Sequence, residues 1–194
     1  MRNLHLMLVL ALATNLPFAT ARAAPADQPE TGQTTCYDVV TNLATPCAGT
    51  GQDGEHRAGV AWPVPRFAVG TGAMLDCVTD NLTGLMWVRS PSTTLATWAN
   101  ALTGANNLTL CGFSDWRLPN INELESLVNS EAANPATFLN GQGFTSVQAS
   151  NYWSSSSSAG SPASDAWIVR MLDGYVAATN KSGSDSVWPV RAGQ

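Results

Sequence analysis

Residues 112–127, Gly-Phe-Ser-Asp-Trp-Arg-Leu-Pro-Asn-Ile-Asn-Glu-Leu-Glu-Ser-Leu, contain the clearest helix start in the chain. Pro119 fixes its own φ and biases Leu118 towards extended backbone. Asn120 is a good N-cap, and the carboxylate of Glu123, three residues later, can reach back to the cap amide. The pattern predicts a helix whose N-cap is Asn120.

Apolar residues continue from this start at helical spacing, so the helix has one face that must be buried. Glu123 is interpreted as a helix cap rather than a catalytic acid, because it occupies the third position after the cap. We expect the Arg117 guanidinium to be held in place, by Asp115 or by a backbone carbonyl near the C-terminus. The side chains expected to be buried are Trp116, Leu118, Ile121, Leu124 and Leu127.

The first 23 residues have the features of a secretory signal peptide. A short basic start precedes an apolar run over residues 4–18 and a small-residue cleavage site, Ala21-Arg22-Ala23. The run is too short for a membrane span, and no stop-transfer pattern follows it. We expect cleavage after Ala23, with Ala21 as the alternative. The predicted protein is exported to the periplasm, the cell surface or the medium, with no transmembrane segment.

Composition excludes some classes of function. Loss of the signal peptide removes Arg2 and Arg22 and leaves 7 basic against 14 acidic residues, a formal charge of −7. A nucleic-acid-binding protein would carry a basic face, so we predict no nucleic-acid partner. We also predict no metal and no cofactor, since the mature chain has a single histidine, His56, and no Cys-x-x-Cys pair.

Four cysteines in an exported chain predict two disulfides. Of the three connectivities we favour Cys36–Cys47 and Cys77–Cys111, because the first pair brackets a short loop rich in turn residues. The chain is accordingly divided into residues 1–23, the signal peptide; residues 24–66, an extension containing the Cys36–Cys47 loop; and residues 67–194, the main domain.

The pattern of helices and strands predicts an α+β fold for the main domain. A hairpin is predicted at residues 77–88, a first helix at 94–103 and the capped helix from Asn120. Residues 134–151 are predicted to be a loop. A twisted antiparallel meander follows, with its strongest strand at 166–172, a turn at Asp173-Gly174 and a final strand at 187–191.

Five separated blocks, in order, resemble one bacterial family. They are residues 80–87 (Asp-Asn-Leu-Thr-Gly-Leu-Met-Trp), Trp98, residues 112–119, residues 152–155 (Tyr-Trp-Ser-Ser) and residues 190–191 (Val-Arg). The family is the domain of unknown function named after the C-terminal domain of the Legionella collagen-like adhesin.

The resemblance covers residues 67–191 and implies a C-type-lectin-like domain. The order of the Arg-Leu-Pro motif, the helix and the C-terminal strand is also similar to that in formylglycine-generating enzymes. The named member is a trimeric surface adhesin that binds sulfated polysaccharides, so the resemblance implies a homo-oligomer such as a trimer and a glycan or surface-protein partner. This chain lacks a collagen-like stalk, is acidic, and lacks the motifs of calcium-dependent sugar binders.

We therefore predict a non-enzymatic, adhesin-like binding module. Catalysis is disfavoured because His56 lies in the extension and no cysteine follows Cys111, where formylglycine-generating enzymes carry active-site thiols. The alternatives are a structural domain that packs in an oligomer without a ligand and, third, an enzyme related to the formylglycine-generating fold. Most tryptophans are expected in the core, Trp87, Trp116, Trp153 and Trp167 among them. The candidate ligand-binding residues lie on the late strands: Arg170, Tyr175 and Trp188.

Overall fold

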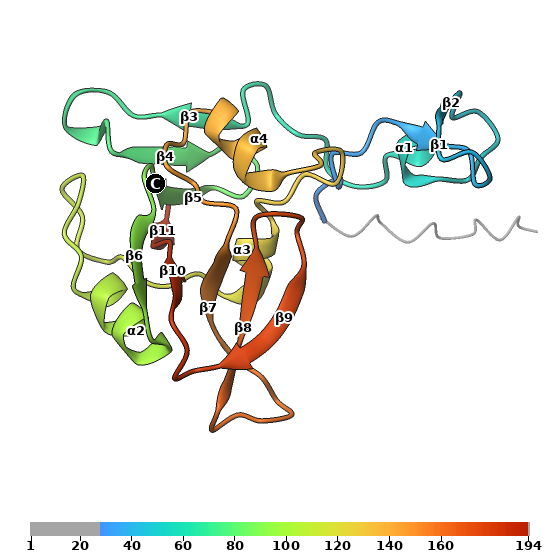
Figure 1. Ribbon diagram of the computed structural model, residues 1–194. Helices are drawn as coiled ribbons and strands as arrows, with labels where there is room; N and C mark the ends of the chain where they lie inside the picture. The colour runs from blue at the N-terminus through green and yellow to red at the C-terminus, as the bar shows by residue number, and fades with distance from the viewer. Residues whose placement is uncertain (1–27, 194) are drawn as a thin grey trace, which may run out of the picture.

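The computed structural model describes residues 28–193, and the predicted signal peptide lies outside the described residues. Figure 1 shows a body, residues 67–193, from which an arm, residues 28–66, extends to one side. The arm contains β1 (Cys36–Tyr37), β2 (Ala44–Thr45) and the single-turn helix α1 (Asp53–His56). The predicted Cys36–Cys47 disulfide is confirmed.

The smaller sheet of the body has the strand order β11-β5-β4-β3 and is entirely antiparallel. The predicted hairpin is confirmed as β4 (Cys77–Asp80) and β5 (Leu85–Val88). The edge strand β3 (Phe67–Val69) follows the proline-restrained segment and is joined to β4 through a 3-10 turn, η1 (Gly72–Met74). The other edge is the C-terminal strand β11 (Val190–Ala192).

The larger sheet has the order β6-β10-β7-β8-β9. Its strands β7 (Asn151–Ser157), β8 (Asp165–Arg170) and β9 (Val176–Asn180) form the predicted antiparallel meander. Strand β10 (Asp185–Val187) then pairs with β7 in parallel and with β6 (Ser92–Ala96) in antiparallel.

The prediction of a single final strand at 187–191 was wrong. Trp188 and Pro189 separate β10 from β11, and the two strands belong to different sheets. A proline has no amide hydrogen for a ladder, which favours a break at this point. Residues 185–192 therefore cross from one sheet to the other.

The body has three α-helices beside its sheets (Figure 1), and two of them differ from the prediction. The first, α2 (Trp98–Asn106), starts later than expected because residues 92–96 pair with β10 as a strand. The expected loop 134–151 contains α4 (Pro135–Gly141). Its cap is a favourable one: the Asn134 side chain accepts from the Thr137 amide at 2.9 Å, with a proline at the first helical position.

The central helix α3 (Ile121–Glu125) begins as predicted, although it is short. The Asn120 side chain accepts from the Glu123 amide at 2.9 Å, and the Glu123 carboxylate accepts from the Asn120 amide at 2.8 Å. This is the capping box that the sequence predicts. Of the expected core residues Trp116, Leu118, Leu124 and Leu127 are buried, and Ile121 is partly buried.

An aromatic cluster between the two sheets forms the centre of the body. The Trp188 ring lies 5.7 Å from Trp87, 5.2 Å from Phe144 and 5.4 Å from Tyr152, and its Nε1 donates to the Val88 carbonyl at 2.8 Å. Trp116 and Trp153 are also buried, whereas Trp167 is only partly buried. The predicted Cys77–Cys111 disulfide is confirmed and links the first hairpin to the segment before α3. The described chain is α+β, with two sheets in the body and a two-stranded sheet in the arm.

Candidate functional site

Each charged residue of the family-like blocks forms an ion pair within the chain. Asp80, which opens the first block, is buried and accepts from Arg66 Nε at 3.1 Å and Nη2 at 3.0 Å. Arg66 Nη2 also donates to the Ser126 carbonyl at 2.6 Å, and the guanidinium stacks over Trp62 at 4.2 Å. One buried ion pair therefore joins the arm, the smaller sheet and the end of α3.

A second pair joins the C-terminus to the segment before α3. Arg191 Nε donates to Asp115 Oδ1 at 2.7 Å and Nη2 to Oδ2 at 3.1 Å, while the guanidinium lies 3.7 Å over the Phe113 ring. The hydrogen bonds from Arg191 hold the pKa of Asp115 below its ordinary value. Neither expected partner of the Arg117 guanidinium was right: Arg191 occupies the Asp115 carboxylate, and Arg117 donates to Glu123 and to the Leu118 carbonyl rather than to a carbonyl near the C-terminus.

Arg117 is held by its own helix cap. Its Nη1 and Nη2 each donate to the Glu123 carboxylate at 2.7 Å. Burial alone would raise the pKa of Glu123, but the hydrogen bonds from Arg117 and from the Asn120 amide outweigh it and lower the pKa. The backbone of Arg117 also pairs with that of Val190. The motif Trp116, Arg117, Leu118, Pro119 and Glu123 thus connects α3 to the C-terminal strand.

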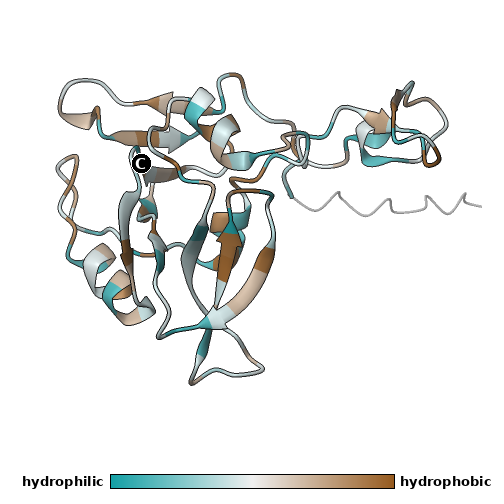
Figure 2. Ribbon diagram, viewed as in Figure 1, coloured by the Kyte–Doolittle hydropathy of each residue, from teal (hydrophilic) through white to brown (hydrophobic). Residues whose placement is uncertain are grey.

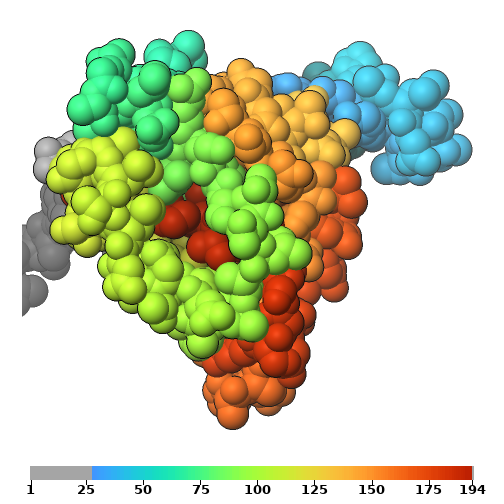
Figure 3. Space-filling view, turned by 60° about the vertical axis from the view of Figure 1, so that its left-hand side comes forward, coloured from blue at the N-terminus to red at the C-terminus, as the bar shows by residue number. Residues whose placement is uncertain are grey.

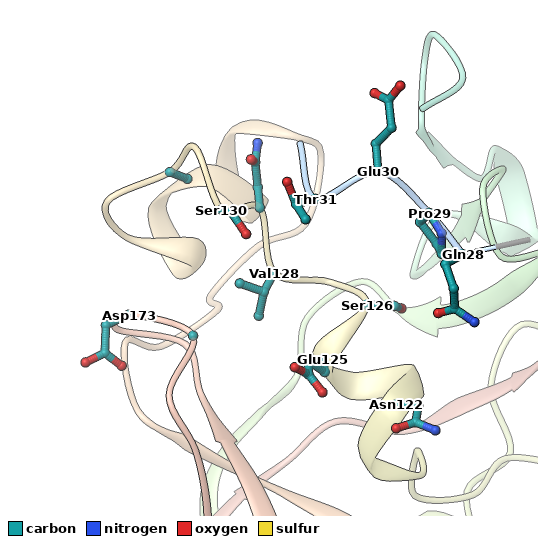
Figure 4. Close-up of a pocket in the computed structure, with 13 residues that line it drawn as sticks. Gln28, Pro29, Glu30, Thr31, Asn122, Glu125, Ser126, Val128, Ser130 and Asp173 are labelled. Atoms are coloured by element: carbon teal, nitrogen blue, oxygen red, sulfur yellow. The ribbon is translucent and has the colours of Figure 1, made fainter. Parts of the chain in front are cut away.

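An open cavity of about 610 Å³ lies where the arm meets the body. We call this cavity the polar hollow. In Figure 4 the arm passes above it, α3 lies below, and the β8–β9 turn closes one side. Its walls are made by Gln28, Pro29, Glu30, Thr31, Asn122, Glu125, Ser126, Val128, Asn129, Ser130, Ala132, Asp173 and Gly174. Amides, hydroxyls and three carboxylates dominate this set.

The arm is fastened beside the polar hollow by hydrogen bonds to the loop after α3. The Ser130 amide donates to the Thr31 carbonyl at 2.9 Å. The Glu131 carboxylate accepts from the amides of Thr34 and Thr35 at 2.8 and 3.0 Å, and from the Thr35 hydroxyl. These hydrogen bonds lower the pKa of Glu131, and the bond from the Thr35 hydroxyl has the largest effect. The polar hollow therefore lies at a junction where hydrogen bonds hold the arm against the body.

A glycine brings the arm close enough for this junction. Gly32 has φ +84°, which L side chains rarely adopt, and a Cβ there would lie 2.5 Å from Asn129 Oδ1 and 2.9 Å from the Trp62 ring. Any side chain at position 32 would push the arm away from Asn129, a residue of the polar hollow. The close approach thus depends on both the backbone conformation and the missing side chain.

The β8–β9 turn forms the far wall, and two of the predicted ligand-binding residues are beside it. Arg170 Nε donates to Asp173 Oδ1 at 2.8 Å, and the guanidinium lies 5.0 Å from the Tyr175 ring. The bonds from Arg170 lower the pKa of Asp173. Tyr175 is 57% exposed. The structure therefore brings Arg170 and Tyr175 together next to Asp173, which lines the hollow.

Trp188, the third predicted ligand-binding residue, is not part of this group. Its side chain is fully buried in the aromatic cluster, so its ring is not available to a surface ligand. The sequence reasoning also missed the lining residues of α3. Asn122 and Glu125 are exposed and three positions apart, a spacing that places them on one face opposite the apolar stripe. That polar face was the available signal.

A second cavity lies within the body, between β6 and α2. It has a volume of about 370 Å³ and no charged lining residue. We call it the apolar hollow. Figure 3 shows it as an opening between the β6 and α2 segments, with C-terminal residues at its base. That base is formed by Val187 and Pro189, and the α2 side by small residues, Ala101, Gly104 and Ala105.

A metal-binding cluster and a membrane-spanning helix are both absent from residues 28–193. This part of the chain has no group of three or more His, Cys, Asp or Glu residues placed to hold a metal ion. None of its helices has the length and apolar character needed to cross a membrane.

The fold and the site define a disulfide-bonded α+β domain with an arm and an open polar hollow at their junction. Residues 76–191 match the family model of the Lcl C-terminal domain, and the chain belongs to this family. The match begins inside the predicted range of 67–191, although β3 at 67–69 pairs with β4 in the same sheet. A comparison with curated proteins found no match.

Proposed function

We propose that the protein is an exported, non-enzymatic binding module that recognises a neutral or amino-sugar glycan in the polar hollow. The observation that carries this proposal is the lining of that cavity, which combines amides, hydroxyls and carboxylates at the junction of arm and body. These are the groups that pair with the hydroxyls of a sugar. Membership of an adhesin-associated domain family supports the same reading.

Charge restricts the class of glycan. Glu30, Glu125 and Asp173 line the hollow; Glu30 is paired with Arg57 and Asp173 with Arg170, whereas Glu125 forms no ion pair within the described residues. Glu125 and the net charge of the chain, −5, would repel a sulfated polysaccharide, whereas a neutral sugar would accept or donate hydrogen bonds and an amino sugar would be attracted. Arg170 and Tyr175 stand at the rim, where the exposed ring offers a face for stacking.

A C-type-lectin-like fold and export of the protein are part of the same proposal. A C-type-lectin-like fold is supported by the pairing of Arg117, just before α3, with Val190 in the C-terminal strand region. Export is supported by two disulfides, which persist in oxidising compartments. The described residues offer no His-centred catalytic group in the body, since His56 lies in α1 of the arm.

A glycan array probed with the protein purified after export tests the proposal. We expect signals on neutral or amino sugars and at least a tenfold loss for Glu125→Gln and Asn122→Ala. Asp76→Asn, an exposed carboxylate in the body outside the hollow, is the matched control and should bind like the parent. Silence on every glycan would refute the proposal, and a preference for sulfated glycans would refute its electrostatic part.

An assembly function is the second candidate, and the observation that favours it is an exposed apolar tip on the arm. Tyr37, Val39, Val40 and Leu43 are all exposed there. A stable oligomer together with silence on the array would favour this candidate. The third, an enzyme related to the formylglycine-generating fold, would require turnover of a peptide or small-molecule substrate by the purified protein.

A further inference from the structure

The turn between β8 and β9 places an aromatic ring beside the polar hollow. Tyr175 is 57% exposed, and Asp173, two residues earlier, lines the hollow. At most about 7 Å of backbone separates these two residues, which is similar to the length of one sugar unit. A ligand that leaves the hollow over this rim would therefore meet the Tyr175 ring.

The Tyr175 ring is held in place by an ion pair. Arg170 Nε donates to Asp173 Oδ1 at 2.8 Å, and its Nη2 donates to Oδ2. The guanidinium held in this way lies 5.0 Å from the centre of the Tyr175 ring. The Tyr175 amide also donates to Asp173 Oδ1, at 3.2 Å, and its carbonyl accepts from the Arg170 amide at 2.8 Å. A cation thus supports one side of the ring, and the remaining exposed surface can meet a ligand.

The turn is also joined to the wall of the polar hollow. Gly174 has φ +77°, and a Cβ at this position would lie 2.8 Å from Val128 Cγ1, so the turn packs directly on a lining residue of the hollow. Below the turn, the buried Val169 of β8 pairs with Val176 of β9, and Figure 2 shows brown, hydrophobic residues on both strands. The ring and the hollow therefore keep a fixed relative position, and binding to both requires little ordering of the protein.

We infer that the polar hollow and the Tyr175 ring are two adjoining subsites for one linear glycan. One unit of the glycan forms hydrogen bonds in the hollow, and the next unit stacks on Tyr175. The inference rests on the proposed function and adds to it the length and the chemistry of the glycan.

Stacking restricts the sugar units that can bind. A sugar stacks on an aromatic ring through a face of C–H groups, so its hydroxyls must be equatorial, as they are in β-1,4-linked glucose and N-acetylglucosamine. Equatorial groups also point sideways, where the side chains of Asn122 and Glu125 in the hollow can pair with them. The β-1,4 linkage gives an extended chain that can run from the hollow over the rim. The expected ligand is therefore a β-1,4-linked oligosaccharide of two or more such units.

Calorimetric titration of the exported protein tests the two subsites. The probes are the mono-, di- and trisaccharides of β-1,4-linked N-acetylglucosamine and of β-1,4-linked glucose. In at least one series the disaccharide should bind about fivefold or more tightly than the monosaccharide, because only the disaccharide reaches the ring. Tyr175→Ala should remove this gain and leave the affinity for the monosaccharide within about twofold, whereas Tyr175→Phe keeps the ring and should keep the gain. Tyr37→Ala is the matched control, because Tyr37 is 44% exposed but lies in the arm outside the hollow.

A second measurement needs no variant and so does not depend on the folding of Tyr175→Ala. The chain has three tyrosines, Tyr37, Tyr152 and Tyr175, and their ring protons can be followed by NMR. The Tyr175 signals should shift on addition of the disaccharide and much less on addition of the monosaccharide. The signals of Tyr37, in the arm, and of Tyr152, in the core, should not move with either.

The outcomes separate this inference from the proposed function. A disaccharide that binds no better than the monosaccharide would overturn the two subsites, and so would a gain that survives Tyr175→Ala. Silence of both series would also overturn them, and signals for other sugars on the glycan array would then leave the proposed function standing. Silence in the titrations and on the whole array would refute both.

Discussion

The two hollows differ in the segments that line them and in the polarity of the lining, and each therefore suits a different kind of ligand. The polar hollow is made by three segments distant in sequence, and carboxylates and amides line it. The apolar hollow is made by β6, α2 and the C-terminal crossing between the sheets, and it has no charge. Polar lining suits a hydrated ligand such as a sugar, whereas an uncharged, largely aliphatic lining suits an apolar side chain.

The two hollows also differ in the interactions that hold their walls together. The polar hollow depends on the docking of the arm, through the Arg66–Asp80 pair and the hydrogen bonds of Glu131. The apolar hollow depends on the body alone. A change that loosens the arm should therefore affect the polar hollow and spare the apolar hollow.

The largest effect is expected for Arg66→Met. The substitution leaves the Asp80 carboxylate buried without its ion-pair partner, which should cost about 3–5 kcal/mol and lower the Tm by roughly 6–20 °C. Thermal unfolding measures this loss. Arg57→Met is the control, because the Arg57–Glu30 pair of the same arm is exposed on the Arg57 side and should contribute about 1 kcal/mol or less. Equal losses for the two variants would contradict the buried-pair argument.

Removal of the disulfides should rank next and should separate body from arm. Cys77→Ala/Cys111→Ala should destabilise the body by about 3–4 kcal/mol, because the bond closes a sequence separation of 34 residues. Cys36→Ala/Cys47→Ala should leave the main unfolding transition of the body nearly unchanged. Peptide mapping without reduction verifies the starting linkages, and differential scanning calorimetry measures the transitions. A larger loss from the arm disulfide would reverse this ranking.

Leu124→Ala should destabilise the floor of the polar hollow. Leu124 is fully buried on α3, so the truncation should cost about 2–5 kcal/mol by lost burial and a residual cavity. Urea unfolding measures the change. Glu125→Ala is the neighbouring control on the same helix; it is exposed and should change stability by about 0.5 kcal/mol or less. A Leu124→Ala protein as stable as this control would show that α3 is not packed as described.

The smallest effect is expected for Arg117→Lys, which keeps the charge but removes the planar fork that meets Glu123. Because the Arg117 side chain is 42% exposed, we expect a loss of only about 0.5–1 kcal/mol. The pKa of Glu123 is lowered in the folded chain, so the pair stabilises the protein above the ordinary value of 4.5 and is lost as pH falls through the lowered value. Tm measured between pH 7 and pH 2 should fall more steeply for the parent than for Glu123→Gln.

The same variant distinguishes structural from ligand-binding roles for Arg117. A structural residue shows the stability loss with unchanged glycan binding. If Arg117→Lys melts like the parent and no longer binds the ligand, the structural assignment is wrong. This outcome would also move the candidate site away from the polar hollow.

Local signals allowed much of the fold to be predicted. The capping box at Asn120 and Glu123 involves residues three apart, so its geometry is settled by local backbone preferences. The hairpin of β4 and β5 is also formed by residues close in sequence, so it too can be predicted from local patterns. Helix α4 was missed although Asn134-Pro135 is a good start signal, because the glycines and asparagines after it were read as a loop.

Long-range pairing decided what the sequence alone did not. Residues 92–96 became a strand because β10, some ninety residues later, pairs with them, and tertiary pairing outweighs helix propensity. The partner of Asp115 was Arg191 rather than Arg117, since the C-terminal strand brings that arginine beside it.

The sequence by itself determined the class of the domain, both disulfides, the capped start of α3 and the family, because each depends on residue types at short or ordered spacings. Only the tertiary structure decided where the hollows lie. The polar hollow collects Thr31, Glu125 and Asp173 from three parts of the chain, and the apolar hollow joins β6 and α2 to Val187. Trp188 was predicted on a late strand, where a side chain can face either surface and only packing decides which. Its burial in the core excludes it from the candidate site.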